Sequence, residues 1–330
     1  MVKDKEVVLN EINILDIGFA IGHAQDEQAA TGCTVILHPK GATAAVDVRG
    51  SAPATRETDL LDPINMVEQV HAIVLSGGSA YGLASADGIM QYLEEQQIGF
   101  DVGVGKVPIV CGACLFDLAV GESHIRPDAK MGYQACQASV NLKEKLACGN
   151  VGAGTGASVG KCLGNDYAMK SGIGHYAVQI GPLKIGAIVA VNAFGDIYTP
   201  DNQALAGCFD RKKHQFLPTD QWLSQQFEKS TIGFNRQNTT IGCILTNAKL
   251  NKAQAKKLAS MAHDGYARAI RPVHTSVDGD SIFTFANGEV ADVAIDVLGN
   301  LASQVMQQAI YVAIKQAKAA YGLPSYQTIQ

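Results

Sequence analysis

The sequence predicts an α/β protein built as a four-layer helix–sheet–sheet–helix sandwich. Segments with strand character occur in clusters that have helical segments on either side, rather than in a regular strand–helix alternation. Glycine accounts for 34 of the 330 residues and alanine is abundant, and small residues let sheets and helices approach closely. The apolar fraction of 47% and the charged fraction of 17% are typical of a globular protein with a substantial core.

The N-terminal half begins with two apolar runs, residues 34–37 and 44–48. Pro39, Lys40 and Gly41 stand between the runs and are typical of a turn, so we expect a β-hairpin. The next elements are expected to be strand, helix, strand and helix, at residues 71–75, 81–95, 107–118 and 127–143. A glycine-rich loop at residues 149–160 ends this half.

The C-terminal half contains a polar segment between two ordered groups. Two or three strands are expected within residues 176–198, with Gly181 and Pro182 as a turn. Residues 200–237 are polar and predict an exposed, mobile connection with one short helix near residues 222–227. A strand, a helix, a loop, a strand and a long helix are expected after it, at residues 240–246, 251–269, 274–280, 282–286 and 290–319.

The first of these C-terminal helices carries both a start signal and a buried face. Asn251, followed three residues later by Gln254, forms the capping-box pattern of a helix N-terminus. An apolar stripe with helical spacing follows, formed by Ala255, Leu258, Ala259, Ala262, Tyr266 and Ala269. We therefore expect this helix to bury one face.

The charge of the chain argues against nucleic acid as a partner. The formal net charge is −5, whereas phosphate binding needs a basic face, and the single basic run at residues 211–214 is expected to be a solvated loop. No apolar run approaches the roughly 20 residues needed to cross a bilayer, and the N-terminus lacks the apolar stretch of a signal peptide. We expect a cytoplasmic protein with no membrane partner and no cofactor.

The cysteines indicate free thiols. Eight cysteines in a long chain without a signal peptide favour reduced thiols over a disulfide framework. Cys111 and Cys114 form a C-x-x-C pair, but no second pair and no suitably spaced histidine completes a zinc site. Their apolar neighbours indicate buried thiols, so no metal site is expected there.

The glycine-rich loop does not match a nucleotide-binding motif. A phosphate loop would need glycine where Thr155 stands and serine or threonine where Cys162 stands, and the dinucleotide fingerprint would need glycine in place of Ala157. Ser158 and Lys161 match a serine–lysine amidase pattern whose companion motifs are absent. The loop remains either a tight backbone crossing or a source of amide N–H groups and Lys161 beside a substrate carbonyl.

Two aspartates, Asp278 and Asp280, flank Gly279 in the loop that begins at His274. A turn is the simplest interpretation, because calcium and zinc sites need more ligands than this segment supplies. The two carboxylates could instead hold a nearby cation, such as a lysine or a terminal amine.

A mobile polar segment ends at Asn238, and the predicted strand begins just after Thr239. A threonine hydroxyl is a weak nucleophile, and no adjacent histidine is available to activate it. If the chain were cut before Thr239, the new α-amine would have an ordinary pKa near 8 and could act as the general base. One residue would then supply both nucleophile and base.

Six blocks of the chain, in order, resemble the L-aminopeptidase/D-esterase family, which includes the nylon-oligomer hydrolases. The similarity runs from about residue 31 to residue 306. The blocks are residues 31–35 (TGCTV), 45–50 (AVDVRG), 75–83 (LSGGSAYGL), 152–161 (GAGTGASVGK), 238–241 (NTTI) and 274–280 (HTSVDGD).

The resemblance implies an N-terminal-nucleophile-like sandwich with its own connectivity, cut between Asn238 and Thr239 into chains 1–238 and 239–330 of one domain. It implies that Thr239 is the nucleophile and that Asn192 stabilises the oxyanion. It further implies that Lys161 is an active-site lysine, and that Asp278 and Asp280 orient this lysine or the amine. The pocket residues it suggests are Ser76, Gly78, Tyr81 and Gly154. A homo-oligomer, specifically a tetramer, is also implied.

The sequence leaves the reaction partly open. The expected substrate is a small peptide or amino-acyl amide, but α- or β-amino termini, D-amino-acid amides or esters, and synthetic amide oligomers all fit. Gln237 stands where family members often have glycine, which leaves the rate of self-cleavage open, and Cys111 and Cys114 replace more ordinary small residues or proline. Ornithine acetyltransferases resemble the same architecture, so acyl transfer is an alternative, and an inactive small-molecule binder is another.

Overall fold

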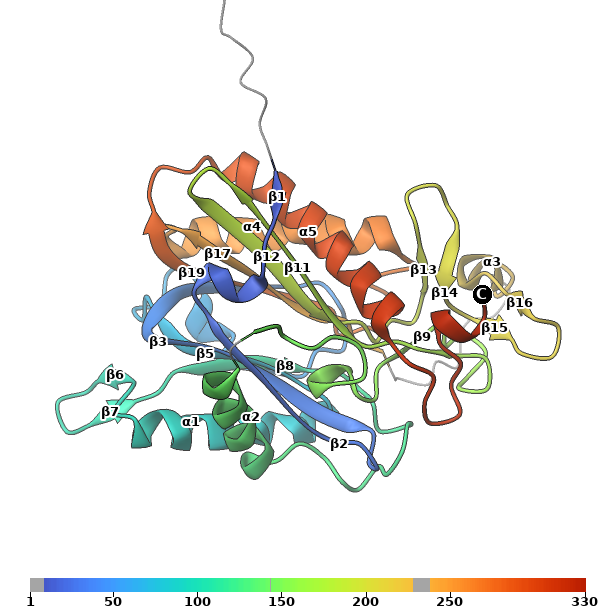
Figure 1. The fold of residues 1–330 in the computed structure, drawn as a ribbon, viewed down its shortest axis with the longest axis horizontal. Coiled ribbons are helices and arrows are strands. Elements are labelled where there is room, and N and C mark those ends of the chain that lie inside the picture. The colour runs from blue at the N-terminus through green and yellow to red at the C-terminus, as the bar shows by residue number, and fades with distance from the viewer. Residues whose placement is uncertain (1–8, 143, 228–237) are drawn as a thin grey trace, which may run out of the picture.

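Four layers build the molecule in the computed structural model, which describes residues 9–142, 144–227 and 238–330 (Figure 1). Helices α4 (Lys252–Ala269) and α5 (Ile295–Gln316) cover one sheet. Helices α1 (Ser85–Glu95) and α2 (Ala129–Asn141) cover the other. The two sheets face each other between these helix pairs, so the predicted helix–sheet–sheet–helix sandwich is confirmed.

The sheet beneath α4 and α5 has the strand order β1-β11-β12-β17-β19-β3. Its pairs are antiparallel except for β17 and β19, which run parallel. The strands are β1 (Asn10–Glu11), β11 (Ile173–Ile180), β12 (Leu183–Ala190), β17 (Ile241–Ala248), β19 (Ser281–Val290) and β3 (Thr31–Val48).

The second sheet is built around the first part of β3. Strands β2 and β5 pair with it, β8 pairs in parallel with β5, and β4 closes the edge. These strands are β2 (Ala20–Asp26), β5 (Val70–Ser76), β8 (Val110–Cys114) and β4 (Thr55–Arg56).

The predicted hairpin at residues 34–48 is wrong. Its two runs belong to the single strand β3, which pairs with β5 through Leu37 and again at Ala42, and with β19 from Thr43 onward. The register shifts between Leu37 and Ala42, where Gly41 has a φ of +77°. The strand bends at Pro39 and Gly41 and passes there from one sheet into the other. Each of the two runs pairs with a different strand, so the runs do not pair with each other as a hairpin would.

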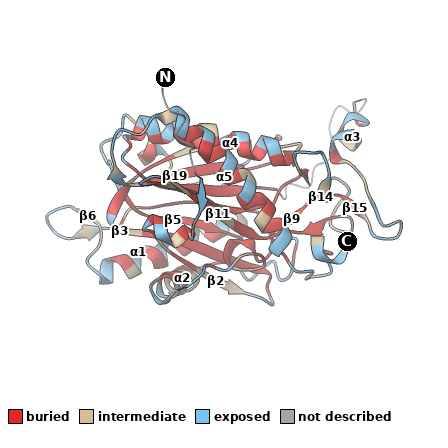
Figure 2. Ribbon diagram, turned by 45° about the horizontal axis from the view of Figure 1, so that its top comes forward, coloured by how far each residue is buried: buried red, intermediate tan, exposed pale blue. Residues whose placement is uncertain are grey.

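Three apolar layers separate these elements, and Figure 2 shows the strands as mostly buried. One cluster fills the space between the sheets and includes Ile73, Ile188 and Phe283. A second lies beneath α4 and α5, and a third lies beneath α1 and α2. The capping box of Asn251 and Gln254 is present, and the six residues of the predicted stripe are all buried in α4.

The short elements gather mainly at the two ends of the sandwich (Figure 1). Helix α3 (Thr219–Ser224) begins earlier than predicted, and three short strands show more order in segment 200–237 than expected, while residues 228–237 lie outside the described residues. The short strands are β6 (Phe100–Asp101), β7 (Lys106–Val107), β9 (Ser158–Val159), β10 (Met169–Lys170), β13 (Asp196–Tyr198), β14 (Ala204–Ala206), β15 (Phe209–Asp210), β16 (Gln215–Phe216) and β18 (Ile270–Arg271). The 3-10 helices are η1 (Ile14–Ile17), η2 (Asp59–Leu61), η3 (Ser79–Ala84), η4 (Gly152–Gly154) and η5 (Tyr326–Thr328).

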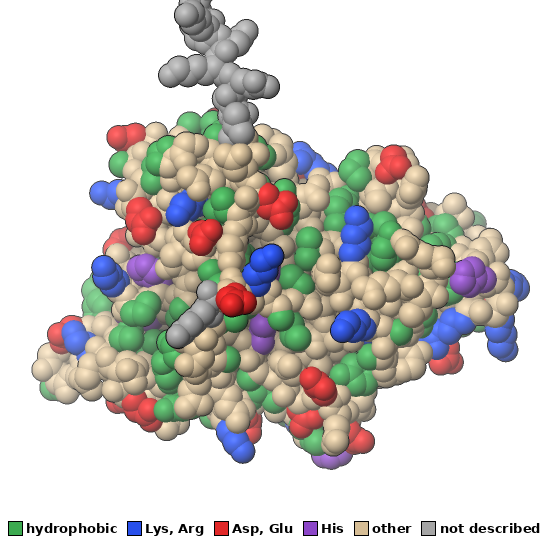
Figure 3. Space-filling model, viewed as in Figure 1, with side chains coloured by type: hydrophobic (Ala, Val, Ile, Leu, Met, Phe, Trp, Pro, Cys, Tyr) green, Lys and Arg blue, Asp and Glu red, His purple; other side chains and the backbone are tan. Residues whose placement is uncertain are grey.

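The surface is mixed in charge. On the face shown in Figure 3, Lys and Arg side chains stand singly or in small groups among Asp and Glu side chains. Among the helices of the described residues, none combines the length and the apolar character needed to span a bilayer.

Candidate active site

Thr239 lies just before the central strand β17, next to the end of β12. Ala190 of β12 pairs with Ile241, and continuing this antiparallel register by two residues places Asn192 opposite Thr239. The main-chain N–H of Thr239 donates a hydrogen bond of 2.9 Å to the Asn192 carbonyl. The Thr239 hydroxyl donates to the carbonyl oxygen of Asn238, and all three residues are buried. The peptide bond before Thr239 is therefore in contact with the predicted nucleophile.

The acidic loop reaches Thr239 from the parallel neighbour, because β17 and β19 start in register. Asp280 Oδ1 accepts a hydrogen bond of 2.8 Å from the main-chain N–H of Thr240. Gly279 lies against Thr239, since a Cβ atom at Gly279 would be 2.8 Å from the Thr239 hydroxyl oxygen. Glycine at 279, first interpreted as part of a turn, thus makes room for the hydroxyl.

Local groups hold both aspartates in place. Asp280 Oδ2 accepts hydrogen bonds from His274, at 2.9 Å from Nδ1 and 3.2 Å from the main-chain N–H. Asp278 Oδ2 accepts from the main-chain N–H of Thr275 at 2.9 Å and from the Thr275 hydroxyl. Within residues 9–142, 144–227 and 238–330, no three or more His, Cys, Asp and Glu side chains are grouped as metal ligands.

Lys161 and the glycine-rich loop that precedes it both donate hydrogen bonds to Asn192. Lys161 Nζ donates to Asn192 Oδ1 at 2.7 Å and to the Asn192 carbonyl at 3.2 Å. Asn192 Oδ1 also accepts from the main-chain N–H of Ser158 at 3.1 Å, and Asn192 Nδ2 donates to the Phe116 carbonyl at 2.8 Å. The glycine-rich loop therefore brings an amide N–H and Lys161 to the residue opposite Thr239.

The second sheet contributes Asp117, which the sequence analysis missed. Asp117 follows β8, is buried, and accepts hydrogen bonds of 2.7 Å from the Gly78 N–H and from the Thr31 hydroxyl. Ser76, the last residue of β5, is buried next to this turn, and Gly78 has a φ of +80°. A single acidic residue at the end of an apolar run was the available signal, because the carboxyl ends of parallel strands meet at one edge.

Tyr81 and Gly154 lie apart from these contacts. Tyr81 is 60% exposed, and the Arg126 guanidinium stacks on its ring at 3.8 Å. Gly154 is buried, and its carbonyl accepts a hydrogen bond of 3.1 Å from Lys170 Nζ. Substrate contact by Ser76, Gly78, Tyr81 and Gly154 stays a prediction.

Burial moves the pKa values of three groups in this region toward neutrality. Burial lowers the pKa of Lys161 to about 7, against the opposing influence of Asp278 and Asp117. Burial, followed by repulsion from Asp280, raises the pKa of Asp278 to about 7. Burial also raises the pKa of Asp117 to about 6, although hydrogen bonds from Gly78 and Thr31 oppose the shift. Perturbed groups of this kind are typical of active sites.

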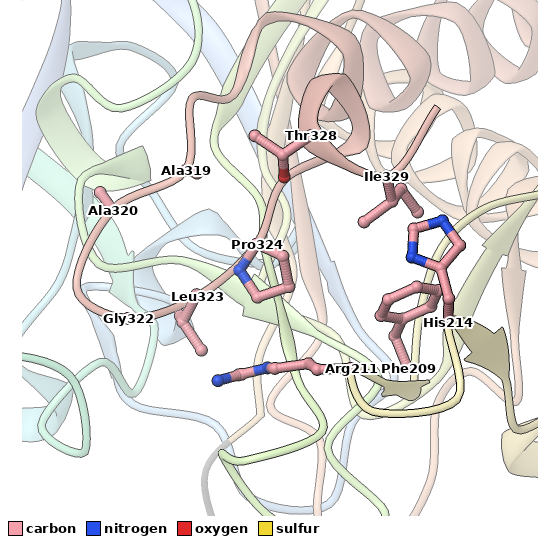
Figure 4. A pocket seen from close by; sticks show the side chains of 10 residues that line it. All are labelled: Phe209, Arg211, His214, Ala319, Ala320, Gly322, Leu323, Pro324, Thr328 and Ile329. Carbon is pink, nitrogen blue, oxygen red and sulfur yellow. The ribbon is translucent and has the colours of Figure 1, made fainter.

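A separate hollow lies beside the C-terminal segment (Figure 4). Its volume is about 520 Å³, and it is lined by Phe209, Arg211, His214 and residues near the end of the chain, such as Pro324 and Ile329. It contains none of the predicted site residues. The Arg211 guanidinium donates to the main-chain carbonyls of Asn165 and Ala168, so part of its hydrogen-bonding capacity serves the fold.

Comparison with known proteins places the chain in a family. The profile of peptidase family S58 matches residues 13–327. The chain belongs to peptidase family S58. It is 39% identical to an uncharacterized aminopeptidase of Mycobacterium leprae, over 95% of this chain and 93% of that protein. It is 29% identical to the 6-aminohexanoate-oligomer endohydrolase of Kocuria sp., over 90% of this chain and 84% of that protein.

Solved structures agree with the S58 assignment at the level of the fold. The β-aminopeptidase of a Burkholderia species matches with a TM-score of 0.64 and 18% identity, over 94% of this chain and 90% of that one. The L-aminopeptidase D-Ala-esterase/amidase of Ochrobactrum anthropi, described as a variant of the Ntn hydrolase fold, matches with a TM-score of 0.65 and 17% identity, over 94% and 89%. This S58 member is therefore a hydrolase of peptide or amide bonds with an Ntn-hydrolase-like fold.

Proposed function

We propose that the protein cuts its own chain between Asn238 and Thr239 and then uses Thr239 as an N-terminal nucleophile. The products are chains 1–238 and 239–330, which stay together in one folded domain. The observation that carries this proposal is the hydrogen bond from the Thr239 hydroxyl to the carbonyl of Asn238. The nucleophile thus lies against the bond that it has to break, in a buried site.

Self-cleavage proceeds as an acyl shift followed by hydrolysis. Thr239 Oγ1 attacks the Asn238 carbonyl carbon, and the C–N bond breaks as the threonine nitrogen takes up the hydroxyl proton. The resulting ester joins Asn238 to the threonine side chain. The acyl shift has already freed the α-amine of Thr239, and water then hydrolyses the ester, which releases a carboxylate on Asn238 and restores the Thr239 hydroxyl. The Asn192 carbonyl already accepts the main-chain N–H of Thr239 at 2.9 Å, so the new amine starts in a fixed position.

Hydrolysis of substrate uses that amine as the base. It takes the proton of the Thr239 hydroxyl as the oxygen attacks the substrate carbonyl, and it returns the proton to the leaving amine. Water then releases the acyl group from the threonine. A protonated Lys161 lowers the pKa of the nearby amine and keeps it neutral near pH 7. Asn192 stabilises the oxyanion, and the buried Asp278 carboxylate favours the charged form of Lys161.

The substrate that we propose is an N-terminal amino-acyl amide or ester of a small peptide or amide oligomer. The similarity to aminopeptidases and to a 6-aminohexanoate-oligomer endohydrolase supports this class. The cytoplasmic location stays a prediction from the sequence, and the tetrameric assembly stays an implication of the family resemblance.

A denaturing gel with intact-mass measurement on the purified protein tests the proposal. We expect two fragments, with Thr239 at the start of the smaller one, and activity on amino-acyl nitroanilides. Thr239→Ala should remain one uncut, inactive chain. Thr284→Ala, which truncates another buried threonine in the neighbouring strand β19, should cut normally. A fully active enzyme that stays full length would refute the proposal, and product transfer to an added amine in place of hydrolysis would favour acyltransferase activity.

A further inference from the structure

Two cysteines meet where the segment after Lys161 contacts the 196–219 region. Cys162 follows Lys161 directly, and Cys208 lies between β14 and β15. The two backbones pack tightly, because a Cβ atom at Gly160 would lie 1.9 Å from the Cys208 nitrogen. The two side chains lie close enough for each thiol to change the pKa of the other.

A buried carboxylate and Thr219 link the surroundings of the two cysteines. Asp196 Oδ1 accepts a hydrogen bond of 2.8 Å from the main-chain N–H of Cys208 and one of 2.7 Å from the Thr219 hydroxyl. The same hydroxyl lies 3.5 Å from the Cys162 sulfur and is within its hydrogen-bonding range. The pair is therefore positioned by a network and does not depend on a chance contact of two side chains.

The two thiols differ in exposure and acidity. Cys162 is partly exposed, and its interaction with the Cys208 side chain lowers its pKa, although burial opposes this shift. Cys208 is buried, and its interaction with the Cys162 side chain, together with burial, raises its pKa. The thiolate is the reactive form of cysteine. Cys148 is also partly exposed, but burial of its sulfur raises its pKa, so exposure alone does not make a thiol reactive here.

We propose that Cys162 and Cys208 form an oxidisable dithiol that reacts with peroxides to give a disulfide. The Cys162 thiolate attacks one peroxide oxygen, the O–O bond breaks, and Cys162 becomes a sulfenic acid while hydroxide leaves. The Cys208 sulfur then attacks the Cys162 sulfur, and the S–O bond breaks. Hydroxide departs and takes the Cys208 thiol proton as water. Two thiols are oxidised, and one hydrogen peroxide is reduced to two molecules of water.

The disulfide would affect the active site by shifting the backbone next to Cys162. The main-chain N–H groups of Gly160 and Lys161 donate to the carbonyls of Gly195 and Phe194, each at 3.1 Å. A covalent bond at the next residue, Cys162, would draw this segment toward residue 208 and change the position of Lys161. We expect oxidation to lower the hydrolytic rate, and this consequence alone rests on the proposed function.

Mass spectrometry after peroxide treatment tests the site independently of activity. The purified wild-type protein is treated with a small excess of hydrogen peroxide, alkylated and digested. We expect a peptide pair joined between Cys162 and Cys208, absent after treatment with dithiothreitol. Cys208→Ser should instead accumulate a sulfenic acid at Cys162 that dimedone traps, and Cys148→Ser, the matched control, should keep the cross-link. Protection of Cys162 from alkylation should develop roughly tenfold faster than that of Cys148.

Two outcomes would overturn the proposal. One is that both thiols are still alkylated when the peroxide-treated protein is unfolded in the presence of the alkylating reagent. The other is that Cys148 is oxidised as fast as Cys162. The hydrolytic rate of oxidised and re-reduced protein is measured in parallel. If the cross-link forms but the protein has no hydrolytic activity, the dithiol proposal is supported and the proposed function is not. If the protein is a normal hydrolase but the cross-link does not form, the dithiol proposal is wrong and the proposed function is unaffected.

Discussion

Lys161 holds Asn192 at two points, with its Nζ atom 2.7 Å from the side-chain oxygen and 3.2 Å from the main-chain carbonyl. That same main-chain carbonyl accepts the N–H of Thr239 at 2.9 Å. One carbonyl group therefore connects the buried cation to the nitrogen that self-cleavage would turn into an amine. The charge on Lys161 and the acidity of that amine should consequently depend on each other.

Lys161→Met should lower kcat/KM by roughly 100-fold, because the amine loses the positive neighbour that keeps it neutral and Asn192 loses a donor. Since the amine must be unprotonated to act, its higher pKa should move the acid limb of the pH–rate profile to higher pH. Lys252→Met is the matched control, since Lys252 is also buried and donates to two carbonyls, but at the other end of β17. Lys252→Met should lower the stability of the protein and leave the pH–rate profile unchanged. If the acid limb of the profile does not shift in Lys161→Met, Lys161 does not control the pKa of the amine.

Asn192→Asp should lower kcat by roughly 100- to 1,000-fold with little change in KM, because the variant keeps an oxygen for Ser158 and Lys161 but loses the amide donor. Asn247 offers a close control: its Oδ1 accepts from the Lys184 N–H at 2.8 Å, and its Nδ2 donates to the Pro182 carbonyl at 3.0 Å. Steady-state kinetics and thermal unfolding of both Asp variants separate catalysis from folding. Equal losses of rate in the two variants would show that Asn192 matters for stability alone.

Gly279→Ala should slow self-cleavage by roughly tenfold or more, because its methyl group would lie 2.8 Å from the Thr239 hydroxyl and 2.6 Å from the Ala52 carbonyl. The uncut fraction is followed on a denaturing gel during expression and after purification. Gly105→Ala places the same methyl group in open space and should cut at the wild-type rate. Normal cutting by Gly279→Ala would mean that this close contact does not restrict the attacking oxygen.

Much of the fold can be predicted from the sequence, because the positions of apolar residues indicate which parts of each helix and strand are buried. The stripe of α4 repeats apolar residues with helical spacing, and β17 is a short, nearly continuous apolar run that is buried along its whole length. The pairing of strands is harder to predict. The two runs of β3 are typical of a hairpin, and only partners far along the chain, β5 and β19, decide that they form one bent strand.

In the candidate site, too, the sequence predicts individual residues but not which of them come together. Thr239 and Asp280 each stand beside the start of a predicted strand, but nothing local states that those strands are parallel neighbours that begin in register. Asp117 comes from the other sheet: its apolar surroundings in the sequence were a signal, but only the packing of the two sheets shows that it lies near Lys161. Lys170 is the one Asp, Glu, Lys or Arg between Asp166 and Lys184, and this isolation was the available signal of its burial.

Lys170 should make stability depend on pH in a direction unusual for a lysine. Its Nζ atom is buried and donates to the carbonyls of Gly154, Ala157 and Ser171, and burial lowers its pKa from 10.5 to about 7. Between these two values the unfolded chain keeps a proton that the folded protein has released, so this group makes the free energy of unfolding rise with pH. Below about pH 7 both states are protonated, and the contribution is flat.

Lys170→Met lacks this proton release, so the Tm of the wild type minus that of the variant should increase from about pH 7 to about pH 10 and stay level below pH 7. Differential scanning fluorimetry across this range, at constant ionic strength, measures the difference directly. Lys184→Met, which removes a lysine whose Nζ bonds the exposed Asp16 carbonyl, should follow the wild-type curve. A constant difference between wild type and Lys170→Met would mean that Lys170 stays protonated in the fold, with its three carbonyls compensating the buried charge.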